Sequence, residues 1–417
     1  MINSSALSAP SAAMSAAARW RLVIIAFITI VLDGFDTTSI SFVVPTLAVE
    51  WGLPPAAFTS AFVTTSVGAV VGYLASGSLT NRLGPRTAIL CSVLVFALGS
   101  FLTVLAQSVF MLATLRLITG IGLGMVLAPT IAMATENFPA HRREFITILI
   151  VSGIGFGSVL GGVFGGRLIA AHGWASIYWV GGFLPLLLLP ILWFGLPRGG
   201  MGGNKQPSPA AKGTVRSLFA GPLAGSTALL WIFSFSIFTA LYALVLWMPT
   251  LLLGFGFAPR ETALGAASMG GGGLLGVMLL IPLFSKFGTA RVLVLASFLS
   301  MAAIVAVSYG HWDRAGLLLL IALIGMGLQA GTMGQSALAV GIYSGASRAT
   351  GIGCAAAAGR IGSIVGPAIG GLLLSLKVST QGAILAACIP ILIGAVTAMA
   401  IHYRRGRAAS PAVSATS

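Results

Sequence analysis

Two carboxylates lie three residues apart inside the first long apolar run of the chain. Asp33 and Asp36 fall about 11 and 14 residues into that run, which begins near residue 22. A three-residue spacing places both side chains on one face of a helix. Two carboxylates this close in a medium of low dielectric favour protonation of at least one of them. The pair therefore has the property that a proton carrier needs.

Two arginines lie inside other apolar runs, Arg116 in the first half of the chain and Arg360 in the second. A guanidinium group binds a carboxylate through two parallel hydrogen bonds and stays charged at any working pH. Arg116 and Arg360 therefore predict an anion-binding site. They are equally suited to pair with Asp33 and Asp36 when no ligand is bound.

The apolar run at 224–250 carries four aromatic residues at helical spacing, namely Trp231, Phe235, Phe238 and Tyr242. One face of a helix there is aromatic, which is typical of stacking on a planar ring and also of simple packing. Further candidates for contact with a ligand are Phe35, between the two aspartates, and Gln329.

The composition shows what kind of scaffold must position these groups. Hydrophobic residues make up 57% of the 417 residues and charged residues 7%, whereas soluble domains are about a quarter charged. The apolar runs are continuous rather than alternating, which excludes a membrane β-barrel. Twelve runs approach the roughly 20 residues that a spanning helix needs, at about 22–44, 58–79, 87–106, 109–133, 146–169, 175–196, 224–250, 262–284, 291–309, 315–338, 348–375 and 380–402. The sequence predicts an all-α membrane protein.

The runs divide the chain into two sets of six. We predict an N-terminal tail at 1–21, a six-helix bundle at 22–196, a linker at 197–223, a second six-helix bundle at 224–402 and a tail at 403–417. With both termini placed in the cytoplasm, 16 of the 22 Lys and Arg residues fall on that side and three on the other. This bias predicts cytoplasmic termini in the inner (plasma) membrane.

The two halves repeat each other. A shift of 205 residues places GSVLGGVFGG (157–166) on GSIVGPAIGG (362–371) and Arg143 on Arg348. The repeat indicates a duplicated six-helix unit with a site between the halves at mid-depth. Arg116 and Arg360 have no charged counterpart in the other half, nor do the two aspartates, so these charges point to function.

Charged residues also gather at the predicted cytoplasmic ends of the helices. We assign conformational gating to Asn81, Arg82, Arg86, Glu136, Arg142 and Arg143. Charges that pair in one conformation and part in another bias a two-state equilibrium. An ordinary solvated, positively charged loop is the alternative interpretation.

No enzyme motif is present: the sequence lacks a Walker A loop, an HExxH pair and a dinucleotide fingerprint. We therefore expect no enzymatic activity, no cofactor, no metal and no nucleic-acid partner. Transport must then draw on an ion gradient or on the gradient of the substrate itself.

The chain resembles the major facilitator superfamily along nearly its whole length. The segments GSLTNRLGPR (77–86) and LRLITGIGLG (115–124) are similar to two motifs of that superfamily. LDGFDTTSISFVVPTLAVEWG (32–52) and GRIGSIVGPAIGG (359–371) resemble the aromatic acid:proton symporters within it. Asn81 stands where the loop motif usually has Asp, which implies a weaker latch between the halves.

The resemblance implies the major facilitator fold and import of benzoate, hydroxybenzoate or hydroxyphenylpropionate type anions with protons. Asp33 and Asp36 would then couple protons, and Arg116 and Arg360 would bind the anion. On that reading Asp36→Asn abolishes proton-driven accumulation. The expected partners are an aromatic carboxylate, a proton and the bilayer, with the protein as a monomer.

The alternatives are a proton-coupled exporter of drugs or organic acids, an importer of non-aromatic carboxylates, a receptor, and a membrane-embedded enzyme.

Overall fold

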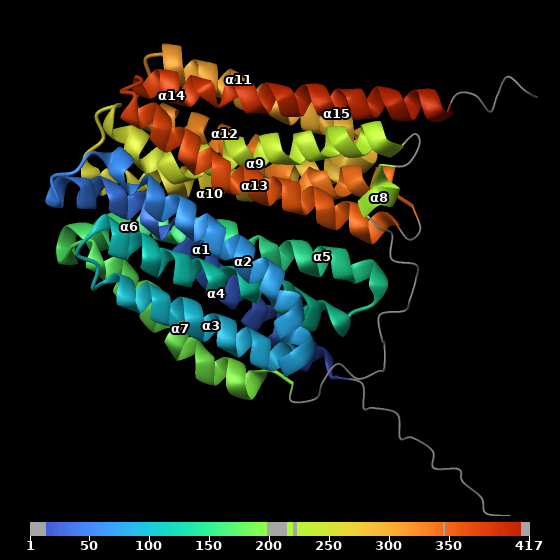
Figure 1. Ribbon diagram of the computed structural model, residues 1–417, viewed down its shortest axis with the longest axis horizontal. Coiled ribbons are helices and arrows are strands. Elements are labelled where there is room, and N and C mark those ends of the chain that lie inside the picture. Colours follow the sequence, from blue (N-terminus) through green and yellow to red (C-terminus); the bar gives the residue numbers. More distant parts are fainter. Residues whose placement is uncertain (1–13, 198–214, 220–222, 345–346, 410–417) are drawn as a thin grey trace, which may run out of the picture.

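The computed structural model describes residues 14–197, 215–219, 223–344 and 347–409, and these ranges are almost entirely helical (Figure 1). Twelve of the spans that they contain are long and apolar enough to cross a membrane, which confirms the predicted number. The first half consists of α1 (Ala16–Glu50), η1 (Pro55–Phe58), α2 (Thr59–Leu83), α3 (Pro85–Thr103), α4 (Val109–Glu136), α5 (Ala140–Val151), α6 (Gly153–His172) and α7 (Ala175–Gly195). The second consists of α9 (Leu223–Leu253), η2 (Pro259–Glu261), α10 (Ala263–Phe287), α11 (Thr289–Tyr309), α12 (Arg314–Ile342), α13 (Ser347–Ser375), α14 (Thr380–Ala386) and α15 (Cys388–Ala409).

The helices extend beyond the apolar runs that predict them. α1 begins at Ala16 rather than near residue 22, because Ser15 caps it by accepting a hydrogen bond from the Ala18 amide and alanines favour the first turn. The C-terminal helix likewise continues to Ala409. Hydropathy marks the part of a helix that suits lipid, whereas caps and propensity decide where the helix ends. Most of the predicted linker lies outside the described residues; the short helix α8 (Val215–Leu218) falls within it.

The predicted repeat is present in three dimensions. In Figure 1 the first half, coloured blue to green, lies along one side of the molecule, and the second half, yellow to red, along the other. The Arg143 Nε donates a hydrogen bond to the Phe138 carbonyl at 2.9 Å, and the Arg348 Nε donates one to the Tyr343 carbonyl at 3.2 Å. Both partners are related by the same shift of 205 residues. Each arginine thus satisfies a carbonyl near the end of a helix.

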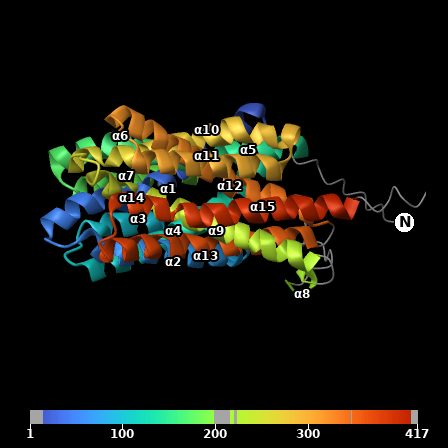
Figure 2. The same ribbon diagram turned by 90° about the horizontal axis from the view of Figure 1, so that it is seen from above.

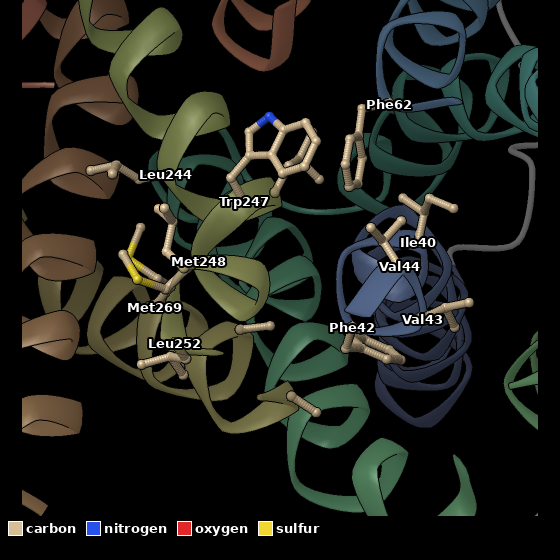
Figure 3. Close-up of a cluster of buried hydrophobic side chains, with 14 of the residues drawn as sticks. Ile40, Phe42, Val43, Val44, Phe62, Leu244, Trp247, Met248, Leu252 and Met269 are labelled. Atoms are coloured by element: carbon tan, nitrogen blue, oxygen red, sulfur yellow. The ribbon is translucent and has the colours of Figure 1, made fainter. Parts of the chain in front are cut away.

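Among the described residues, the halves meet mainly along three pairs of helices, α1 with α9, α2 with α13, and α6 with α10. At one end of these pairs a single apolar cluster spans both halves, and Figure 3 shows Phe42, Phe62, Trp247 and Leu252 within it. The rings of Phe62 and Trp247 meet edge to face, with centroids 4.6 Å apart. We call this end the Trp247 end.

The opposite end, which carries Arg82 at the end of α2, is built differently. There the buried apolar residues form two separate clusters, one in each half. Leu22 and Phe138 belong to the cluster of the first half, and Leu218 and Tyr343 to that of the second. The halves therefore share a core at the Trp247 end, while at the Arg82 end each half has its own.

Candidate functional site

The two aspartates lie in the middle of α1, which runs through them without a break. Gly34 between them explains how they are positioned. A Cβ atom at Gly34 would collide with the backbone of Ile154 on α6, so only glycine permits this close approach of the two helices. Asp33 and Asp36 therefore flank a tight helix–helix contact, and they enter different surroundings.

Asp36 lies in a fully buried polar network inside the first half. Its Oδ1 is 2.6 Å from Nη1 of Arg116, and neither side chain is exposed to solvent. Arg116 also donates to the Asp36 carbonyl at 3.1 Å and to Thr65 Oγ1 at 3.3 Å. The Ser100 hydroxyl donates to the second carboxylate oxygen, and the guanidinium lies over the Tyr178 ring. Both charges are thus neutralised and hydrogen-bonded within one half.

Asp33 instead lines a cavity between the halves. It is 6% exposed and accepts a hydrogen bond from Thr37 Oγ1 at 3.2 Å. In the described part of the chain it forms no ion pair. A buried carboxylate without a close cationic partner is costly when ionised, so Asp33 is the carboxylate better suited to taking up a proton.

Arg360 reaches the same cavity from α13 of the second half. Its guanidinium carbon lies 4.0 Å from the centroid of the Tyr73 ring, and Tyr242 lines the cavity beside it. Arg360 and Asp33 line this cavity together, one from each half. One cation, one carboxylate and two phenol rings, from both halves, therefore surround one cavity.

The other predicted ligand contacts are not among the residues that line this cavity. Phe35 is buried against Phe42, with ring centroids 6.3 Å apart. Phe238 stacks on the lining residue Tyr242, with ring centroids 6.2 Å apart. Gln329 packs near Gly273 on α10. Arg116 does not line the cavity, but it donates a hydrogen bond to Thr65, which does.

The predicted gating residues lie at the Arg82 end. Asn81, Arg82, Glu136 and Arg142 are exposed, as is Arg143, which binds the carbonyls of Phe138 and Glu136. Arg86 donates to the Trp193 carbonyl and lies over the Trp193 ring. Among the described residues, no hydrogen bond or ion pair joins 77–86 to 136–144.

Tyr73 is one of several lining residues that the sequence analysis did not assign to the site; Thr37, Ser66 and Ser363 are others. A single tyrosine in an apolar helix carries no distinctive signal. The available clue was spacing, since Ser66 and Tyr73 are seven residues apart and so share a helix face. Only the approach of α13 to α2 shows that this face meets Arg360.

Comparison with known proteins places the chain in a family. The model of the Major Facilitator Superfamily matches residues 26–328. The chain is 30% identical to the gallate transporter of Pseudomonas putida, over 96% of this chain and 95% of that protein. It is 31% identical to the 3-(3-hydroxy-phenyl)propionate transporter of Escherichia coli, over 94% of this chain and 96% of that protein. It is also 29% identical to the 4-hydroxybenzoate transporter PcaK of Pseudomonas aeruginosa, over 89% and 90% of the two chains.

A solved structure supports the same fold. A bacterial homologue of the human lysosomal transporter Spinster, crystallised in an inward-facing and unoccupied conformation, superposes with a TM-score of 0.74 at 17% identity. The match covers 94% of this chain and 99% of that one. With its twelve spans and transporter relatives, the chain is a transporter and not an enzyme. It belongs to the Major Facilitator Superfamily and, within it, to the aromatic acid transporters.

Proposed function

We propose that this protein imports an aromatic carboxylate together with a proton, by alternating exposure of the cavity that contains Asp33 and Arg360. The observation that carries the proposal is the position of these two charges, which face one buried cavity from opposite halves. Relatives named as gallate, 4-hydroxybenzoate and hydroxyphenylpropionate transporters support an aromatic anion as the substrate.

Arg360 is the anion-binding group in this proposal. Its guanidinium fits a carboxylate in two-point geometry, and the rings of Tyr73 and Tyr242 beside it offer faces and edges for an aromatic ring. Arg116 is less suited to this task, because Asp36 already occupies its guanidinium.

Charge balance in the cavity supports coupling to one proton. With Asp33 ionised and Arg360 charged, the empty site is neutral; a bound monovalent carboxylate would leave one uncompensated negative charge. Protonation of Asp33 restores neutrality, and an uncompensated charge in a low-dielectric site is costly. The loaded site is thus neutral only with one proton per anion, which favours movement of the halves in that state.

The arrangement of the apolar clusters supports a cavity that is closed at the Trp247 end and opens toward the Arg82 end. The halves share a core at the Trp247 end and have separate cores at the Arg82 end. Most of the basic residues that the structure describes lie at the Arg82 end, which the positive-inside rule assigns to the cytoplasm of an inner (plasma) membrane. On this assignment both termini are cytoplasmic and the structure is closed toward the outside.

The decisive experiment is uptake of labelled benzoate, 4-hydroxybenzoate, gallate, hydroxyphenylpropionate and matched aliphatic acids by cells that produce the protein. We expect accumulation of an aromatic acid, and its loss when a protonophore is added. Accumulation of aliphatic acids alone would exclude the aromatic substrate class. Absence of uptake together with resistance to toxic compounds would favour an exporter instead.

Arg360→Lys tests how the anion is bound. Lysine keeps the positive charge but loses the planar fork and the stacking on Tyr73. We expect the apparent affinity for the substrate to fall about tenfold, which corresponds to roughly 1.4 kcal/mol, while proton dependence is retained. The measurement is uptake against substrate concentration, with Arg291→Lys, an exposed arginine on α11, as a matched control. An unchanged affinity would remove Arg360 from the binding site.

A further inference from the structure

A second concave surface lies at the Trp247 end, away from the central cavity. It is an open groove of about 620 Å³ where α6 meets η2 and the start of α10. Figure 2 shows α6 and α10 next to each other, one from each half. None of the residues that line this groove lines the cavity of Asp33 and Arg360. The groove is therefore a separate feature.

Two arginines flank the groove, Arg167 on α6 and Arg260 on η2. Both side chains are exposed, and in the described part of the chain neither forms a side-chain hydrogen bond or an ion pair. The neighbouring Glu261 is already engaged. Its Oε1 is 2.8 Å from Nη1 of Arg314, and its Oε2 accepts a hydrogen bond from the Ala258 amide at 2.9 Å. The groove thus has two uncommitted positive charges.

The rest of the groove is mainly apolar. Gly162, Val163, Gly166, Ala170 and Leu264 contribute to its wall. A Cβ atom at Gly166 would collide with the carbonyl of Arg260, so the two backbones touch there. The wall belongs to two spans that are apolar enough to cross a membrane, and its arginines lie near their ends. In a bilayer that these spans cross, the groove would face lipid and its arginines would lie near the headgroups.

We propose that this groove binds an anionic phospholipid, with the phosphate held between Arg167 and Arg260 and an acyl chain along the apolar wall. Arginine side chains bind phosphate oxygens through charge-assisted hydrogen bonds. A soluble anion would gain only the two exposed charges, whereas a phospholipid also fills the apolar wall. Because the arginines belong to different halves, a lipid bound to both stabilises the arrangement in which the halves touch at the Trp247 end.

The test uses the full-length protein, purified and stripped of lipid in detergent. Dioleoyl phosphatidylglycerol, dioleoyl phosphatidylcholine and inorganic phosphate are titrated separately, with binding followed by native mass spectrometry and by thermal stability. We expect phosphatidylglycerol to bind and to raise the melting temperature. Arg167→Gln and Arg260→Gln should each weaken binding about fivefold, and the double variant about 25-fold, as expected for roughly 1 kcal/mol per arginine.

Lys377→Gln is the matched control, since Lys377 is an exposed cation at the same end that does not line the groove. It should bind phosphatidylglycerol as the unmodified protein does, and all variants should remain monodisperse. Equal binding of phosphatidylcholine would overturn the proposal, as would binding of neither lipid. It would also fail if phosphate alone bound as tightly, or if Lys377→Gln had the same effect as the arginine variants.

Discussion

Replacing Arg116 by leucine should strongly destabilise the protein. The substitution leaves the Asp36 carboxylate buried without its partner, and breaking a buried ion pair in this way costs about 3–5 kcal/mol. Because neither side chain is exposed, water cannot compensate the remaining charge. We expect a lower melting temperature in detergent and loss of the monodisperse fraction in size-exclusion chromatography.

The double variant Arg116→Leu/Asp36→Asn should recover much of this stability, because it removes both charges together. Arg291→Leu, which removes an exposed arginine from α11, is the matched control and should change stability little. A single Arg116→Leu variant as stable as the unmodified protein would contradict the structural role of the pair.

The double variant also separates two roles for Asp36. If the Asp36–Arg116 pair only holds α1 to α4, the neutralised protein still accumulates substrate in response to protons. If Asp36 itself couples protons, accumulation is lost although the protein is folded. Asp36→Asn alone leaves Arg116 buried and unpaired, so a loss of accumulation in that variant could come from instability. Comparison with the double variant separates instability from loss of proton coupling.

Asp33→Asn should uncouple transport from the proton gradient. Asparagine is close in shape to a protonated aspartate but cannot release a proton. In vesicles with a pH step of one unit and no electrical potential, coupling to one proton predicts about tenfold accumulation, since one pH unit corresponds to about 1.36 kcal/mol. The Asp33→Asn variant should only equilibrate the substrate, giving a ratio of about one, while exchange of labelled for unlabelled substrate continues.

Thr37→Val is the control for this experiment, because it removes the hydroxyl that donates to Asp33 and keeps the carboxylate. It should retain accumulation driven by the pH step. An electrical potential alone should drive no accumulation through the unmodified protein, because a monovalent anion and one proton carry no net charge together. Tenfold accumulation by Asp33→Asn would exclude Asp33 as the coupling group.

The sequence predicted the spans and the repeat well, because both depend on patterns along the chain. Apolar length marks a membrane helix, and the common shift of 205 residues reappears in the paired contacts of Arg143 and Arg348. It also predicted that Asp33 and Arg360 lie deep in the bundle, because intramembrane charges are rare and usually functional.

The sequence did not predict that Asp33 and Asp36 have different surroundings. Three residues along an α-helix rotate a side chain to within about 60° of its starting direction, so spacing alone suggests one shared environment. In the structure this small rotation is sufficient to place Asp33 in the cavity lining and Asp36 in the interior of the first half, because α1 lies at the boundary of both. The role of Tyr73 likewise depends on α13, which is almost 300 residues further along the chain.

The shared apolar cluster at the Trp247 end has a thermodynamic consequence for the transport cycle. Opening that end would expose the rings of Phe62 and Trp247 to water. Hydration of apolar surface raises the heat capacity, and burial of apolar surface weakens on cooling. The free-energy difference between the outward-open and the closed state should therefore depend non-linearly on temperature. An Arrhenius plot of the transport rate should then be curved rather than straight.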